Sequence, residues 1–142
     1  PAFNERKMKN MKNDCELIAK KENINFKWNT KFPLNSLYVM RGYLVVEKDL
    51  KKKFFDKCFE AYWKDNVDIS IEKNIDNILK ICELDKDIFF DKIQNQETKD
   101  KLKELTNLAF EKDIFGAPTF VVNNKIFWGQ DRLNYALDEY YS

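Results

Sequence analysis

Apolar residues recur at steps of three and four along most of the chain, which is the spacing of one face of an α-helix. Met8, Met11, Cys15 and Ile18 show this spacing near the N-terminus. The same periodicity, interrupted by turn residues, predicts helices over residues 4–21, 37–47, 50–64, 70–81, 85–94 and 98–112. The middle of the chain is therefore expected to be helical.

The pattern changes in the C-terminal part of the chain. Residues 119–122 and 125–128 are rich in β-branched and aromatic side chains, as strands are. Asn123 and Asn124 lie between them, and asparagine tolerates the positive φ that a two-residue hairpin turn requires. This stretch is therefore predicted to be a β-hairpin.

Turn-forming residues flank the hairpin on both sides. Pro118, in Gly116-Ala117-Pro118, belongs at the start or edge of a strand because proline removes a hydrogen-bond donor from the ladder. A cis Ala117–Pro118 bond would leave the Ala117 backbone facing outward, but only about 5% of such bonds are cis, so the sequence leaves the isomer open. Gly129 opens a helix to about residue 140, with Asp131 in its first turn, where a carboxylate complements the dipole.

The hairpin has few candidate partners in this sequence. A two-stranded hairpin is only marginally stable alone. Phe120, Val121 and Val122 suggest a strand that is buried on both faces, and only residues 24–28 alternate enough to offer another strand. We therefore expect this chain to be the C-terminal part of a larger protein, or to complete its sheet with another chain.

Composition narrows the classes of function. The 142 residues are 44% hydrophobic, which suits one globular domain. A net charge of +1 provides no basic surface for nucleic acid or membranes, and no apolar run approaches the length of a membrane span. The three cysteines form no C-x-x-C pair, so we expect free thiols in a reducing cytoplasm. Because the chain has no histidine, no metal site is predicted.

Two stretches resemble a known enzyme family. Residues 115–120, Phe-Gly-Ala-Pro-Thr-Phe, and 127–133, Phe-Trp-Gly-Gln-Asp-Arg-Leu, are similar to the C-terminal signature of the 2-hydroxychromene-2-carboxylate isomerases. Residues 32–37, Phe-Pro-Leu-Asn-Ser-Leu, followed by Arg41, match a second motif in the right order and position. Helix capping by Asn35 and surface pairing by Arg41 explain this second match equally well.

The resemblance implies a fold and a division of the chain. The family consists of glutathione-dependent enzymes close to the kappa-class glutathione transferases, within the DsbA-like branch of the thioredoxin fold. The expected fold is therefore α/β thioredoxin-like, and mostly helical in this chain. Residues 1–142 would form one incomplete domain without its N-terminal β-α-β unit, with a helical insert over about 36–112 and a β-β-α part over about 113–142.

Glutathione-binding groups follow from the residues, and the resemblance implies the same assignment. The main chain of Ala117, before Pro118, can pair with the cysteinyl backbone of glutathione. The helix start at Gln130 and Asp131 offers free N–H groups to its γ-glutamyl carboxylate, and the Asp131 side chain can pair with the ammonium. Pro118 and Arg132 are assigned to the same glutathione site.

Each of these assignments has a simpler alternative. Pro118 could be an ordinary trans proline that leads into a strand. Asp131 could be only a first-turn acid, or an ion-pair partner of Arg132 or Lys125. Arg132 could only orient Asp131 or face solvent.

The resemblance implies an isomerase that acts on an unsaturated aromatic-derived acid. The reaction would be reversible addition of the glutathione thiolate, bond rotation and elimination. In the family a serine on the first strand-to-helix turn stabilises the thiolate, but Ser36, Ser70 and Ser142 lie in other contexts, so no catalytic residue is assigned in this chain.

Other functions remain open. The alternatives within the fold are a kappa-type transferase and a DsbA-like protein-disulfide oxidoreductase. The alternative of another class is a non-catalytic helical interaction protein. A homodimer is compatible with the sequence.

Overall fold

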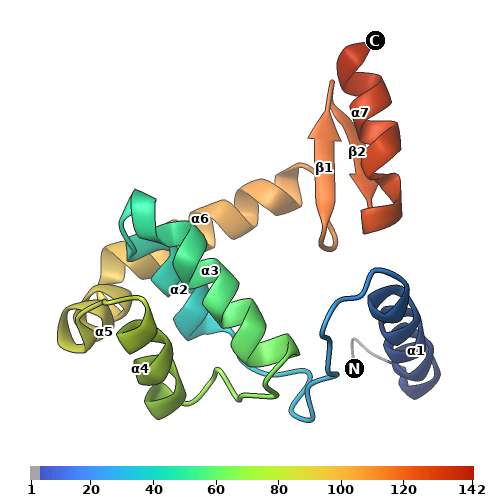
Figure 1. Ribbon diagram of the computed structural model, residues 1–142. Helices are drawn as coiled ribbons and strands as arrows, with labels where there is room; N and C mark the ends of the chain where they lie inside the picture. The colour runs from blue at the N-terminus through green and yellow to red at the C-terminus, as the bar shows by residue number, and fades with distance from the viewer. Residues whose placement is uncertain (1–3) are drawn as a thin grey trace. The chain divides into compact units, whose positions relative to one another are not determined.

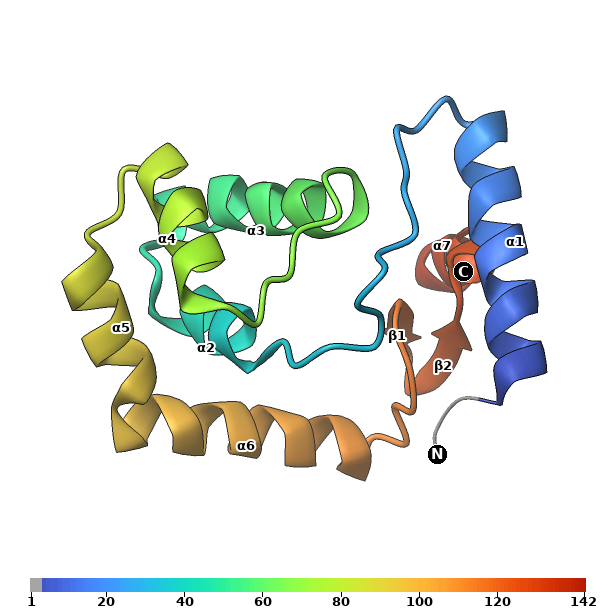
Figure 2. The same cartoon turned by 90° about the horizontal axis from the view of Figure 1, so that it is seen from below.

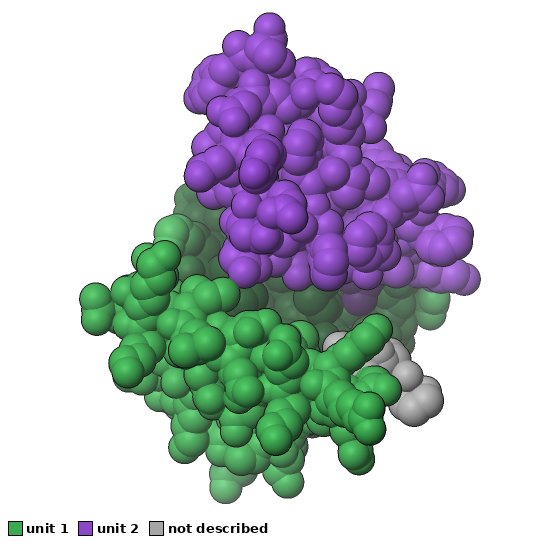
Figure 3. Space-filling view, turned by 90° about the vertical axis from the view of Figure 1, so that its right-hand side faces the viewer, with its two compact units in different colours: residues 1–99 green, residues 100–142 purple. Residues whose placement is uncertain are grey.

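A computed structural model gives the fold of residues 4–142 (Figure 1). The chain forms two compact units, one up to Lys99 and the other from Asp100 to Ser142 (Figure 3). We describe each unit by itself. The expected helical insert over 36–112 and β-β-α part over 113–142 stay predictions, since this division by packing does not test them.

The predicted helices are all present, with ends within three residues of the expected ones. α6 begins two residues early because the Asn95 side-chain oxygen accepts a hydrogen bond from the Glu97 backbone N–H at 2.9 Å and so caps the helix. The helices are α1 (Glu5–Lys21), α2 (Leu37–Val45), α3 (Lys48–Trp63), α4 (Glu72–Ile81), α5 (Lys86–Gln94), α6 (Gln96–Glu111) and α7 (Leu133–Tyr141).

The core of the first unit lies among α2, α3, α4 and α5, which gather together in both ribbon views (Figures 1 and 2). Phe54 of α3, Ile75 and Leu79 of α4 and Ile93 of α5 are almost completely buried. Gly42 lets α2 approach closely, because a Cβ there would lie 2.5 Å from the Phe89 ring and 2.9 Å from the Phe54 ring.

A buried asparagine fastens the segment between α1 and α2 to the end of α3. The Asn29 side-chain nitrogen donates to the Tyr62 carbonyl at 2.9 Å and to the Val67 carbonyl at 3.0 Å. Its oxygen accepts from the Lys31 N–H at 2.8 Å. All three polar positions of this side chain are thus used at 1% exposure, as a buried amide requires.

Residues 24–28 do not form a strand, so this possible sheet partner is excluded. The Lys27 N–H instead donates to the carbonyl of Trp63, at the C-terminal end of α3, at 2.6 Å. Phe26 stacks on Trp63 with ring centroids 5.6 Å apart, and Trp28 lies 5.7 Å from it. The last carbonyls of a helix have no partner within the helix, and here the segment between α1 and α2 provides donors for two of them, those of Tyr62 and Trp63.

The second unit is built on the predicted hairpin. β1 (Thr119–Val122) pairs antiparallel with β2 (Lys125–Trp128), with Thr119 opposite Trp128 and Val122 opposite Lys125. Asn123 and Asn124 have φ values of 49° and 61°, as a two-residue turn of this kind requires. The sequence therefore specified both the strands and their register.

α7 packs along the hairpin, as both ribbon views show (Figures 1 and 2). Its Ala136 is buried at 3% exposure. The expectation that β1 is buried on both faces is wrong for the described chain, because Val121 is 42% exposed. The described sheet has two strands, so one face and both edges remain open.

The cysteines behave as expected of unpaired thiols. Cys58 and Cys82 are buried, Cys15 is half-buried, and all three are free. Within residues 4–142, no helix is long and apolar enough to cross a membrane.

Candidate functional site

The turn before β1 is held against the side chain of Trp128. A Cβ on Gly116 would lie 2.6 Å from the indole nitrogen of Trp128, so a side chain there would displace the indole ring. The Phe115 ring lies 5.0 Å from the Trp128 ring, and the Thr119 hydroxyl donates to the Gly116 carbonyl at 2.6 Å. The Ala117–Pro118 peptide bond, left open by the sequence, is cis.

The hairpin brings this turn beside the start of the last helix. The Gly129 N–H donates to the Pro118 carbonyl at 2.9 Å, one step beyond the Thr119–Trp128 pair. Residues 130–132 form a short 3-10 helix, η1 (Gln130–Arg132), that leads into α7. The two segments that carry the predicted glutathione-binding residues are therefore neighbours within one unit.

Gly129 has a backbone conformation that residues with a side chain rarely adopt. Its φ is +110°, and a Cβ there would lie 2.6 Å from a carboxylate oxygen of Asp131. Glycine thus permits both the turn out of β2 and the position of the Asp131 side chain. This role was not predicted from the sequence.

Ala117, Gln130 and Asp131 present backbone groups without partners. Among the described residues, neither the N–H nor the C=O of Ala117 forms a hydrogen bond, and the N–H groups of Gln130 and Asp131 have no acceptor. All three residues are exposed. A ligand with peptide groups and a carboxylate could bind these free donors and acceptors.

Asp131 and Arg132 form an ion pair with each other. An Arg132 guanidinium nitrogen lies 2.8 Å from an Asp131 carboxylate oxygen, with the two side chains 51% and 62% exposed. The guanidinium also lies over the Tyr135 ring, 5.6 Å from its centroid. Arg132 therefore holds the Asp131 carboxylate on its side of η1. A shallow hollow of about 400 Å³ lies beside Arg132 and is lined by Ile126, Phe127, Trp128, Arg132 and Tyr135.

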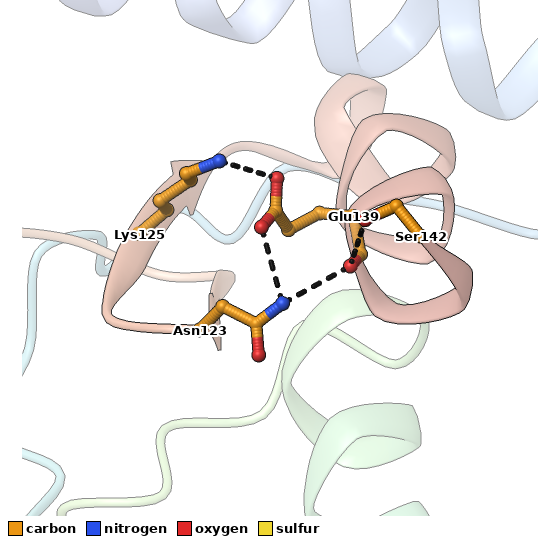
Figure 4. A network of polar contacts seen from close by, with 4 residues as sticks. All are labelled: Asn123, Lys125, Glu139 and Ser142. Atoms are coloured by element: carbon orange, nitrogen blue, oxygen red, sulfur yellow. Dashed lines mark hydrogen bonds and ion pairs between the residues drawn. The ribbon is translucent and has the colours of Figure 1, made fainter.

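Lys125 binds a residue other than Asp131. Its ammonium pairs with the Glu139 carboxylate at 2.6 Å, and the Asn123 side chain donates to the same carboxylate at 3.1 Å (Figure 4). Asn123 also donates to the Glu139 carbonyl at 3.2 Å, which the Ser142 hydroxyl contacts at 2.9 Å. Hydrogen bonds from Lys125 and then Asn123 lower the pKa of Glu139 below its usual value. This network ties the hairpin turn to α7.

The second motif matched in the sequence lies in the first unit. The Asn35 side-chain oxygen accepts from the backbone N–H of Leu37, the first residue of α2, at 2.9 Å, whereas the N-cap residue Ser36 makes no side-chain capping bond. Arg41, on α2, has a buried Nε without a hydrogen-bond partner in the described chain. Asn35 thus binds one of the free N–H groups at the start of α2, although it is not the N-cap residue itself.

Known proteins resemble this chain in sequence and in fold. The model of the family described as DSBA-like thioredoxin domain matches residues 1–141. A protein named 2-hydroxychromene-2-carboxylate isomerase from Pseudomonas sp. (strain C18) is 29% identical over 80 residues, which cover 56% of this chain and 38% of that protein. A protein of the same name from Sphingobium xenophagum is 24% identical over 88 residues, or 62% of this chain and 45% of that protein.

A solved structure shows the same fold. The structure titled 2-hydroxychromene-2-carboxylate isomerase superposes with a TM-score of 0.82 at 20% identity, over 94% of this chain and 66% of that one. The thioredoxin-like fold expected from the sequence is thus confirmed. The chain spans less than half the length of the two curated relatives described above.

Proposed function

Because the chain belongs to the family of DSBA-like thioredoxin domains, we propose that it acts in a glutathione-dependent isomerase of the 2-hydroxychromene-2-carboxylate type. The names of the two curated relatives support the reaction class. One observation carries the proposal of a glutathione site, namely the hydrogen bond that places the unpaired Ala117 backbone beside the free N–H groups of η1.

The unpaired groups fit the two ends of glutathione. The Ala117 N–H and C=O can pair with the cysteinyl backbone, as one added residue of a strand would. The N–H groups of Gln130 and Asp131 can hold the γ-glutamyl carboxylate, and the Asp131 carboxylate can hold the ammonium. Pro118 fixes the position of Ala117, and Arg132 orients Asp131.

Bound glutathione would supply the thiol that adds to an unsaturated aromatic-derived acid and later leaves it. The second unit provides binding and positioning, because its serine, Ser142, donates its hydroxyl to Glu139 at the far end of α7. We therefore assign no catalytic residue to this unit. The alternative of a kappa-type transferase would use the same binding groups.

The cysteines give no support to a dithiol oxidoreductase. Burial raises the pKa of the Cys15, Cys58 and Cys82 thiols, and that of Cys58 reaches about 12. A redox-active cysteine needs a lowered pKa and access to its partner. The three cysteines of this chain therefore do not suit dithiol exchange.

Calorimetry with three ligands tests the role of Asp131. Removing its charge in Asp131→Asn should weaken glutathione binding roughly 10- to 100-fold, because a charged hydrogen bond contributes about 1.5–3 kcal/mol. S-methylglutathione should show the same loss, since the contact does not involve the thiol. Glutaryl-Cys-Gly, which lacks only the ammonium, should bind the wild type and the variant equally.

Asp138→Asn is the matched control, because Asp138 is an exposed acid on α7 with no ion pair in the described chain. It should bind glutathione as the wild type does. Equal loss of glutaryl-Cys-Gly binding in Asp131→Asn would contradict the assigned contact. A folded wild-type protein that ignores millimolar glutathione would contradict the proposal as a whole.

A further inference from the structure

We propose that the first unit contains a second binding site, which takes an uncharged planar aromatic molecule of about two fused rings. The site is a pocket between the loop before α2, α2 itself and α3. It shares no residue with the proposed glutathione site. Its lining residues are Phe32, Pro33, Leu34, Ser36, Val39, Met40, Cys58, Phe59, Tyr62, Trp63 and Ile69.

The size of the pocket sets the size of the ligand. Its volume is about 280 Å³. An apolar protein cavity of about 150 Å³ is enough to bind benzene. A molecule of two fused rings therefore fits, whereas a single ring would leave much of the space empty.

The lining provides aromatic surface with a deep side and an open side. Cys58, Tyr62 and Ile69 are buried at 6–8% exposure and form the deep side. Met40 and Phe59 are 49% and 52% exposed and form the rim. Aromatic rings pack through offset or edge contacts. In this pocket the Trp63 ring already has two such neighbours, since its centroid lies 4.4 Å from that of Tyr62 and 5.9 Å from that of Phe32.

The polar groups of the pocket are donors without a partner. Within the described chain, the Tyr62 hydroxyl, the Cys58 thiol and the Ser36 hydroxyl make no hydrogen bond. Burial raises the pKa of both Tyr62 and Cys58, so these two stay protonated at neutral pH. One ligand oxygen can therefore be recognised on an otherwise apolar ring system.

The lining residues offer no cationic side chain to an anionic ligand. None of them is a lysine or an arginine. A carboxylate inside the pocket would lose its water without gaining a cation. The pocket therefore selects against aromatic acids, which separates it from the site where the proposed acid substrate would react.

Titrating the protein with 2-naphthol and with 2-naphthoate tests the site, at a pH where only 2-naphthoate is charged. Calorimetry should show saturable binding of 2-naphthol and binding of 2-naphthoate weaker by at least about tenfold. Carbon-13 methyl spectra should shift at Val39, Met40 and Ile69 when 2-naphthol is added. No saturable binding, or shifts confined to the second unit, would overturn the proposal.

Two matched variants locate the rim. Met40→Glu places a charge at the mouth of the pocket and should weaken 2-naphthol binding about fivefold or more, because apolar contact is lost there. Leu37→Glu makes the same change on an exposed residue of α2 outside the pocket and should bind normally. Equal affinity of both variants would overturn the assigned position. Both residues belong to the first unit, and neither is part of the proposed glutathione site. Glutathione binding should therefore be unchanged in both variants, so the two proposals fail independently.

Discussion

Replacing Asn29 by aspartate exchanges one heavy atom, the side-chain nitrogen, for an oxygen at a buried anchor of the first unit. Asn29→Asp keeps the acceptor for the Lys31 N–H but removes both donors to the Tyr62 and Val67 carbonyls. A carboxylate then faces two carbonyl oxygens at a position with 1% exposure. The shape of the side chain is unchanged, so the loss is electrostatic.

The expected cost follows from the contacts that are lost. Two hydrogen bonds contribute about 1 kcal/mol each, and a buried charge without a partner adds more, which gives a loss of about 3–5 kcal/mol at neutral pH. That is a large part of the roughly 5–15 kcal/mol by which a native protein is stable. Urea unfolding followed by far-ultraviolet circular dichroism measures it.

The pH dependence separates this electrostatic cost from a packing defect. Burial raises the pKa of the introduced carboxyl group in the folded state above the value of about 3.9 in the unfolded chain. The folded state therefore binds a proton more readily, and the loss of stability is complete above the raised pKa and shrinks as the pH falls towards about 4. Each measurement is compared with the wild type at the same pH.

The control is Asn25→Asp, an exposed position in the same segment with no side-chain hydrogen bond in the described chain. It should change the free energy of unfolding by less than about 0.5 kcal/mol. The reasoning is refuted if Asn29→Asp is as stable as this control, or if its cost is the same at about pH 7 and about pH 5.

Two further predictions concern the second unit. Glu139→Gln should lower the melting temperature at neutral pH and have little effect near pH 3. The pKa of Glu139 is lowered in the folded state, so its charge stabilises the fold above the ordinary pKa of 4.5, and this stability is lost as the pH falls through the folded-state pKa. A pH-independent effect in scanning calorimetry would contradict this reasoning. Gly129→Ala should cost about 1–3 kcal/mol through its positive φ and turn the Asp131 side chain away. Amide hydrogen exchange in β1 and β2 reports the loss of stability, and adding Asp131→Asn to Gly129→Ala should weaken glutathione binding no further; additive losses would contradict the link between these residues.

Local patterns were sufficient for the elements of this fold. Periodicity located the helices, and Asn123-Asn124 between two β-rich runs fixed the hairpin and its register. The FGAPTF and FWGQDRL segments placed the candidate site, and the structure brings them together through the Gly129–Pro118 hydrogen bond. Each of these features depends on residues near each other in sequence.

Features that depend on distant contacts were not predicted. In the sequence Asn29 is indistinguishable from an ordinary loop residue. It anchors its segment only because it binds the carbonyls of Tyr62 and Val67, which lie 33 and 38 residues further along the chain. The sequence offers several acidic residues as partners for Lys125. Only the packing of α7 against the hairpin shows that the partner is Glu139. Residues 24–28 alternate like a strand, yet the free end of α3 determines their position.

The position of Trp128 against Gly116 should make its fluorescence sensitive to changes at this site. The indole nitrogen lies against the backbone immediately before Ala117, and the ring is 53% exposed. Indole emission depends on the polarity and the dipoles around the ring, so a peptide-like molecule on the Ala117 backbone would alter its colour and intensity. With Trp28 and Trp63, the other two tryptophans, replaced by phenylalanine, the protein would carry its own fluorophore at the edge of the proposed glutathione site.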